Sequence, residues 1–165
     1  MADVFTVTFL ILGMLITLPA LWLLMGALFP AAVERSRGRL ASTPVRCFLA
    51  GLLPALVAVA LMALPNPGAK GIGFLLFLAL VLVAGVGLAG LSTIVGERLP
   101  SRADEGRPWR GLVRGAVCLE LSFLLPFLGW LGILPVVLVT GLGAACLALL
   151  SSPAATASAP APAAA

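Results

Sequence analysis

The stretch that decides the fold runs from Trp109 to Leu150 and reads WRGLVRGAVCLELSFLLPFLGWLGILPVVLVTGLGAACLALL. It begins in a basic loop, continues into the longest apolar run of the chain, and carries inside that run a single acidic residue, Glu120. Residues 119–150 would be about 48 Å long as a straight helix, whereas one upright span needs to cross about 30 Å of hydrocarbon. We therefore expect this segment to bend.

Helix-breaking residues indicate where the bend lies: Pro126, Gly129, Gly132 and Pro135. A proline ring removes a backbone hydrogen bond and crowds the preceding turn, which interrupts a helix. We expect a broken fourth transmembrane element over residues 119–150, whose final helix begins at about Val136. A re-entrant hairpin over residues 119–134 is the alternative, and irregular backbone at that depth requires cover from protein or water.

The composition of the chain places it in a bilayer. Of its 165 residues, 62% are hydrophobic and 10% are charged. A soluble domain is roughly 45–50% apolar and about 25% charged. Because this chain has too little polar surface to cover a water-facing exterior, the sequence predicts an integral membrane protein.

Three further apolar runs precede this stretch, so we expect an all-α architecture of four transmembrane helices, the fourth broken at Pro126–Pro135. The spans are expected at about residues 4–29, 47–64, 72–95 and 119–150. Together they form one polytopic membrane domain, residues 1–150. The uncharged, Ala/Pro/Ser-rich tail that follows, residues 151–165, cannot bury a core and is expected to be disordered.

The charge distribution predicts the topology. Nine of the ten basic residues lie in the loops after the first and third spans, and the positive-inside rule places those loops in the cytoplasm. With four spans, both termini and the turn at Lys70 then lie outside the cytoplasm. Abundant Ala, Gly, Pro and Arg with few Lys and Asn suggest a GC-rich bacterial genome, so we expect the bacterial inner membrane.

Glu120 is the one ionisable residue expected below the membrane interface. A carboxylate at that depth is costly, so it should be paired or protonated. We favour a structural ion pair with Arg114 or Arg46, because Glu120 lies about one turn from the basic loop and long cationic side chains reach toward interfaces. The other hypothesis is a proton or cation site.

Gly85, Ala89 and Thr93 recur every four residues in the third span and line one stripe on which another helix can approach closely. This stripe is either a dimerisation face or a packing face for the second or fourth helix of the same chain. Small residues serve both uses, and we favour packing within the chain.

The residue inventory argues against catalysis and bound metals or cofactors. Histidine and tyrosine are absent, and Cys47, Cys118 and Cys146 show no CxxC spacing, so no metal or cofactor site is expected. No span holds a nucleophile with a base, or a pair of aspartates, so we expect no enzyme. Nucleic-acid binding is not expected, because no folded domain accompanies the basic loops.

The pattern RGAVCLELSFLLPFLGWLGILPVVLVTGLGAACLAL, following a span that ends GERL, resembles the membrane segments that some bacterial proteins carry beside a bactofilin-type, polymer-forming domain. The likeness covers about residues 48–150 and rests on Gly, Pro and Leu positions. The chain departs from that arrangement in lacking a β-helical polymer-forming domain. The resemblance implies a membrane-embedded scaffold or anchor and carries over no functional residues.

We therefore expect a non-enzymatic accessory or scaffold protein that lies in membrane lipid and packs against another integral membrane protein or a second copy of itself. The alternative is a small oligomeric channel or transporter, with Glu120 and the broken fourth helix in its conducting path. Secondary transporters use broken helices to expose backbone groups to substrate. The small number of spans and the lack of polar residues along a midplane path disfavour this alternative.

Overall fold

The computed structural model describes residues 2–99, 107–125 and 127–150, and every structural statement below concerns those residues. Within them the secondary structure is helical and no strand occurs. Four helical segments are long and apolar enough to cross a membrane: Val4–Leu28, Pro44–Ala63, Pro67–Glu97 and Leu128–Leu150. The predicted all-α class with four helices of transmembrane length is thereby confirmed.

The elements in chain order are α1 (Ala2–Leu28), α2 (Pro30–Ser42), α3 (Pro44–Ala63), α4 (Pro67–Glu97), α5 (Pro108–Phe123), the π-helix η2 (Leu128–Ile133) and α6 (Leu134–Leu150). Each helix from α2 to α5 has a proline in its first turn. A proline fits there because the first N–H groups of a helix have no partner inside the helix. The prolines therefore mark the points where the chain begins a new helix.

Helix α2 was not expected, since its residues form the first basic loop of the predicted topology. Its buried residues are Ala32, Val33, Ser36 and Leu40, and their spacing places them on one helix face. That face packs against α4 and α6, and the buried Ser36 hydroxyl donates to the Ala32 carbonyl at 2.8 Å. The loop is thus an amphipathic helix.

Arginines tie α2 to the ends of α4 and α6. Arg37 lies between two carboxylates, 2.6 Å from Glu34 and 2.7 Å from Glu97 at the end of α4. Burial alone lowers the pKa of Arg37, but the hydrogen bond to Glu97 and the nearby carboxylates raise it above its ordinary value. Arg35 donates to the Ala148 carbonyl at 3.2 Å, near the end of α6. We call this part of the molecule, formed by α2 and the adjoining ends of α3, α4, α5 and α6, the basic end.

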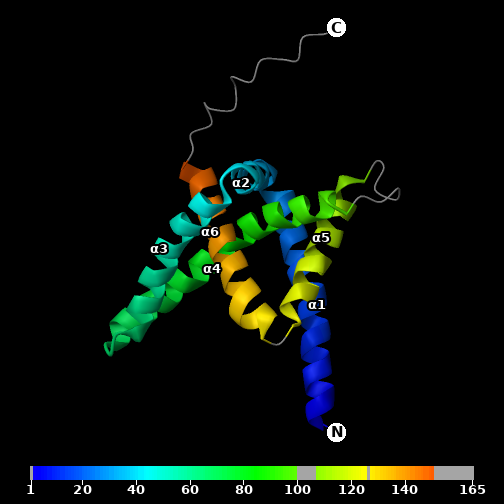
Figure 1. The fold of residues 1–165 in the computed structure, drawn as a ribbon. Coiled ribbons are helices and arrows are strands. Elements are labelled where there is room, and N and C mark those ends of the chain that lie inside the picture. The colour runs from blue at the N-terminus through cyan, green and yellow to red at the C-terminus, as the bar shows by residue number, and fades with distance from the viewer. Residues whose placement is uncertain (1, 100–106, 126, 151–165) are drawn as a thin grey trace.

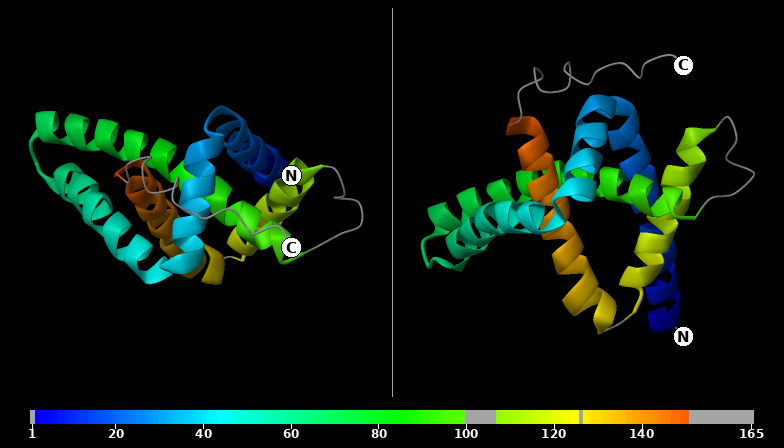
Figure 2. Two further views of the ribbon diagram at one scale, coloured as in Figure 1. Left: turned by 90° about the horizontal axis from the view of Figure 1, so that it is seen from above. Right: turned by 45° about the horizontal axis from the view of Figure 1, so that its top comes forward.

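Three arms extend from the basic end (Figure 1). They are α1, the hairpin of α3 and α4, and the hairpin of α5 with η2 and α6. The views in Figure 2 show the same three arms diverging with distance from α2. Helix α4 passes through the centre of this arrangement and packs against α1, α2, α3, α5 and α6.

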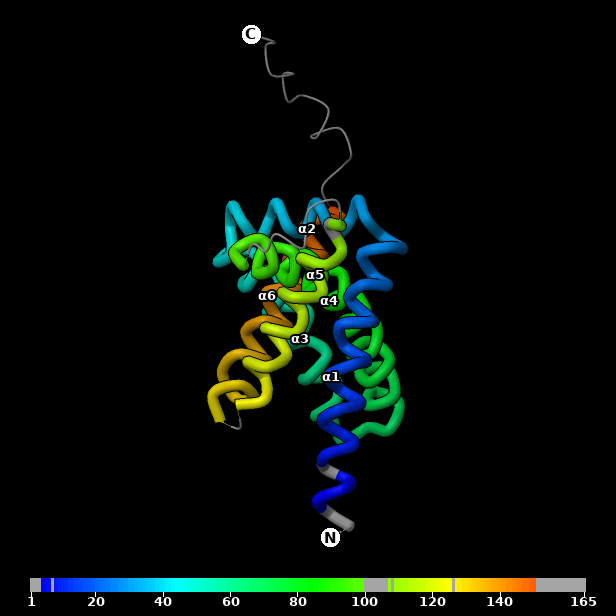
Figure 3. The backbone as a smooth tube through the Cα atoms, turned by 90° about the vertical axis from the view of Figure 1, so that its right-hand side faces the viewer, coloured from blue at the N-terminus to red at the C-terminus, as the bar shows by residue number. Residues whose placement is uncertain are grey.

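The two ends of the described chain lie at opposite ends of the molecule, which differs from the predicted topology. Figure 3 shows the start of α1 far from α2, whereas the last turn of α6 lies beside α2. The four predicted spans placed both termini on one side. The difference arises because α5 is a separate helix whose direction opposes that of α6 (Figure 1), which adds one change of direction to the path.

The residues of the predicted fourth span are divided between α5 and the continuous pair of η2 and α6. Residues 119–123 belong to α5, and the fourth apolar helical segment begins at Leu128. Gly129 and Gly132 lie inside η2 and Pro135 lies in the first turn of α6, so these three residues do not separate two helices. Pro126 lies outside the described residues. Because α5 and α6 run in opposite directions, the chain enters and returns as in the re-entrant alternative. How deep this hairpin lies in a membrane stays a prediction.

Helix backbones approach most closely at glycines, because only hydrogen atoms separate them there. A Cβ atom added to Gly87 would overlap the backbone of Gly141, and one added to Gly96 would overlap the backbone of Gly111. The same holds for Gly51 against Val139 and Gly143, for Gly143 against Cys47, and for Gly115 against Ser92. Glycines thus set the contacts of α4 with α5 and of α6 with α3 and α4.

The stripe of Gly85, Ala89 and Thr93 has an intrachain role. Gly85 and Ala89 are buried inside the chain, and a Cβ atom on Gly85 would lie 3.7 Å from the Met25 side chain of α1. The Thr93 hydroxyl donates to the Gly90 carbonyl at 2.6 Å. The stripe thus contributes to packing within one chain, and at Gly85 the neighbour is α1 instead of the second or fourth helix.

We predict that Gly87→Ala lowers the free energy of unfolding by about 1–3 kcal/mol, since its methyl group would displace the α6 backbone. Gly71→Ala in the same helix is the matched control, because a Cβ atom there meets nothing within 4 Å. The control should be neutral or stabilise by up to about 1 kcal/mol through helix propensity. Unfolding by SDS in mixed micelles measures both, and equal effects would contradict the glycine contacts.

Candidate functional site

The position of Glu120 follows from how α5 packs. Leu112, Ala116, Leu119 and Phe123 recur along one face of α5 and belong to the main core cluster, together with Trp22 of α1. Residues four apart on a helix share a face. Glu120 therefore lies one turn beyond the fully buried Ala116, and the packing of α5 against α4 and α1 carries it into the interior.

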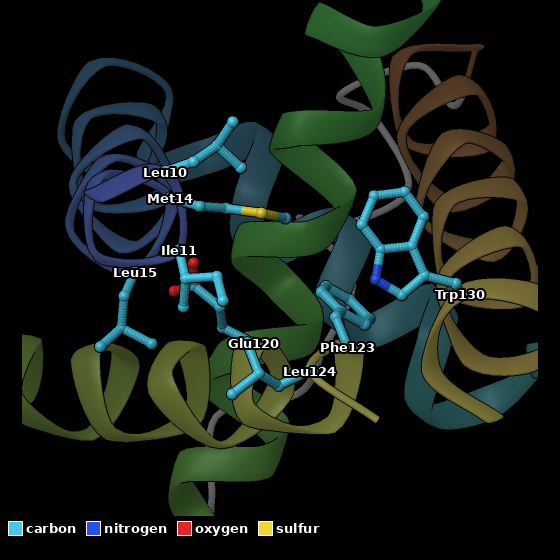
Figure 4. A pocket seen from close by; sticks show the side chains of 8 residues that line it. All are labelled: Leu10, Ile11, Met14, Leu15, Glu120, Phe123, Leu124 and Trp130. Carbon is cyan, nitrogen blue, oxygen red and sulfur yellow. The ribbon is translucent and has the colours of Figure 1, made fainter. Parts of the chain in front are cut away.

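Glu120 is a buried acid without a partner. Its relative exposure is 2%, and neither carboxylate oxygen has a hydrogen-bond partner in the part of the chain that the structure describes. Figure 4 shows the two oxygens directed toward α1, beside Ile11. Buried polar groups are almost always hydrogen-bonded, so an unsatisfied carboxyl group requires an explanation.

A cavity of about 280 Å³ adjoins the carboxyl group. Its walls come from three elements, and the lining residues are Leu10, Ile11, Met14 and Leu15 of α1, Glu120, Phe123 and Leu124 at the end of α5, and Trp130 of η2. In Figure 4 the Trp130 ring extends from η2 into this space, and the Phe123 ring lies between it and Glu120. The cavity therefore combines one ionisable group with aliphatic, thioether and aromatic walls.

The expected ion pair of Glu120 is not formed among the described residues. The Arg114 guanidinium donates to the Leu99 carbonyl. Arg114 precedes Glu120 by six residues, which turns the two side chains about 120° apart on the helix. Arg46 is exposed near the start of α3, and α3 packs mainly against α6 and α4. The sequence singled out this acid, and the described structure does not pair it with either predicted arginine.

Charged groups on the neighbouring elements do not offset this burial. Residues 4–28 of α1 and all of η2 include no charged group, and the charged groups of α4 lie at its ends, as Lys70 and Glu97. An ionised carboxylate without a partner costs several kcal/mol in apolar surroundings, whereas a neutral acid costs far less. The site thus favours either the neutral acid or a cation bound beside the carboxylate.

Sequence reasoning missed most of the cavity. The four α1 residues share a helix face, at spacings of one, three and four, yet the same spacings occur throughout an apolar span. Trp130 and Phe123 gave no signal either, because aromatic residues are common in such segments. No group of three or more metal-binding side chains occurs in residues 2–99, 107–125 and 127–150. This absence does not test the rest of the chain, and the expectation of no metal site stays a prediction.

Comparison of the chain with protein-family models, curated proteins and solved structures finds no match. The resemblance to membrane segments beside bactofilin-type domains accordingly stays a hypothesis. The site must be interpreted from its own chemistry.

We predict that Glu120→Met stabilises the protein by about 1–3 kcal/mol, because methionine has a similar length and removes an unsatisfied polar group from an apolar site. Such a gain is typical when a residue is kept for function. The free energy of unfolding in mixed micelles measures the change. A loss of stability would indicate that Glu120 has a structural partner after all.

Proposed function

We propose that this protein is a non-enzymatic, membrane-embedded accessory or scaffold protein that packs against another integral membrane protein. The observation that carries this proposal is the large apolar surface of the three arms. In an 18-residue apolar stretch of each helix, only 12% of the residues of α1 and 17% of those of α3 are buried within the chain, against 33% for α4. Two helices thus have most of their apolar side chains free to contact lipid or another protein.

Helix α1 offers the clearest partner surface. All of its described side chains from Val4 to Gly13 are exposed, including Phe5 at 61% and Phe9 at 70%. This half of α1 extends beyond the other helices (Figure 1). In lipid, helices associate through packing and hydrogen bonds, so a protruding helix with bulky side chains suits a groove on a partner protein.

The proposed orientation places the basic end in the cytoplasm, following the positive-inside rule. Arg39 and Arg46 are exposed there, and each contributes on the order of 1 kcal/mol of attraction to anionic headgroups. The start of α1 and the turn at Lys70 then lie on the outer side, and the end of α6 lies on the cytoplasmic side. This replaces the prediction of two external termini and retains the bacterial inner membrane as a hypothesis.

A channel or transporter is the second candidate, and the unpartnered Glu120 beside its cavity favours it. The other buried polar side chains of the described chain weigh against it. Ser36 and Ser92 are the buried hydroxyl groups, and both donate to carbonyls of their own helices. Because the described interior offers no polar path between the two ends, we give precedence to the accessory role.

The orientation is testable with single cysteines in a variant without Cys47, Cys118 and Cys146. Ala41→Cys and Lys70→Cys should react with an impermeant maleimide from opposite sides of the membrane, the first in inside-out vesicles and the second in right-side-out vesicles. Both positions are exposed, so each should be accessible to the reagent. Reaction of both from the same side would contradict the proposed orientation.

The accessory role is testable by gentle purification from native membranes through a C-terminal tag, followed by mass spectrometry. We expect one larger membrane protein in stoichiometric amount, and we expect Phe9→Ala to reduce its recovery severalfold. Leu49→Ala on α3, which is also exposed at 59%, is the control and should retain the partner. Recovery of this chain alone, as a monomer or homo-oligomer with lipid, would contradict the proposal.

A further inference from the structure

We infer that the cavity between α1, α5 and η2 is a binding site for a small organic cation with apolar substituents, of the alkylammonium class, and that the Glu120 carboxylate is its counter-ion. This inference goes beyond the accessory role and does not depend on any protein partner. It rests on the combination of a cavity with a buried acid, without a hydrogen-bond partner among the described residues, in the cavity wall. Neither the apolar surface nor the acid would support it alone.

The walls of the cavity match the chemistry of such a ligand. Two aromatic rings, Phe123 and Trp130, lie on one side of the space (Figure 4), and aromatic faces attract ammonium groups. The α1 wall supplies three aliphatic side chains and the Met14 thioether, which suit apolar substituents. Because Glu120 is the one ionisable side chain among the described lining residues, the site selects against anions.

The size and location of the cavity also fit. Its volume of about 280 Å³ exceeds the roughly 150 Å³ that an apolar protein cavity needs to hold benzene. Two of its lining residues, Leu10 and Trp130, are 67% and 60% exposed. The side chains at its edge therefore face the same apolar surroundings as the arms, and the ligand must be soluble in the membrane to enter.

Binding of a cation should also release a proton from Glu120, which can be measured. Without a ligand, the apolar site favours the neutral carboxylic acid. When the cation binds, the O–H bond of Glu120 breaks, the proton passes to the solvent, and the carboxylate pairs with the ammonium group. Each bound cation thus releases one proton, and net charge in the site is conserved.

No other charged group of the described residues lies where it could take part in this exchange of a proton for the cation. Residues 4–28 of α1 and all of η2 carry none. On α4, Lys70, Glu97 and Arg98 lie at the ends of the helix. On α5 itself, Arg110 and Arg114 lie nearer the basic end, where Arg114 donates to the Leu99 carbonyl. Binding should therefore weaken at low pH through protonation of a single carboxylate.

The test uses benzyltrimethylammonium as the probe and neopentylbenzene, its uncharged carbon analogue of the same shape, as the control ligand. Equilibrium dialysis against the full-length protein in detergent should give saturable binding of the cation at one site per chain. Calorimetry in buffers of different ionisation enthalpy should report close to one proton released at neutral pH.

Glu120→Gln should weaken cation binding at least about tenfold, which corresponds to about 1.4 kcal/mol, and should abolish proton release. The same variant should leave the uptake of neopentylbenzene unchanged. Glu34→Gln is the control for loss of one acid, because Glu34 is largely exposed at the basic end, and it should bind the cation as the natural protein does.

Trp130→Ala provides a second variant that should not disturb folding, since Trp130 is mostly exposed. It should weaken cation binding about threefold to tenfold through loss of a cation–π contact, whereas Leu131→Ala, at 77% exposure on the same element, should have no effect. Absence of saturable binding, or equal binding of the cation by the natural protein and Glu120→Gln, would overturn the inference.

Discussion

Close contact between helix backbones at glycine is the constraint on which the rest of this structure depends. Gly96 and Gly115 allow α4 and α5 to touch along their backbones, and Gly87 does the same for α4 and α6. Lipid tails are as apolar as leucine, so helix association in a membrane relies on packing and not on the expulsion of water. Near the basic end the helices lie close together, and farther away the three arms diverge (Figure 1).

This packing creates the unusual environment of Glu120. The glycines hold the first half of α5 against α4, and the apolar face of α5 continues past them to Leu119 and Phe123. The carboxyl group is thereby carried away from the arginines of the basic end and placed against α1. Its burial is a consequence of the fold. The described residues offer it no hydrogen-bond partner, so its desolvation lowers the stability of the folded state. Such costs persist in proteins where a function requires them.

The sequence predicted the helical class and the four helices of transmembrane length because long apolar runs without charge have few alternatives in a bilayer. It also identified Glu120, since a lone acid in an apolar run is rare. It missed α2, because the basic residues of this segment indicated a loop although its apolar residues recur with helical spacing. It also joined residues 119–123 to α6. Proline and glycine positions indicated an interruption of the helix, but they could not show that α5 and α6 run in opposite directions.

The partners of Glu120 were beyond sequence reasoning for a similar reason. Arg114 is near in sequence, and distance along a helix says little about which face a side chain occupies. The α1 residues that surround the carboxyl group are more than a hundred positions away and resemble every other aliphatic residue of a span. Only the three-dimensional packing of α1 on α5 shows that, among the described residues, the acid lies between apolar side chains and has no hydrogen-bonded cation.

The central claim is that Glu120 is a neutral acid without a partner when its cavity is empty. Infrared difference spectroscopy between the natural protein and Glu120→Gln in lipid at neutral pH tests it most directly. We predict that the natural protein shows the carbonyl stretch of a protonated, weakly hydrogen-bonded carboxylic acid that the variant lacks. A difference confined to carboxylate bands would show an ionised, paired Glu120 and would contradict the account.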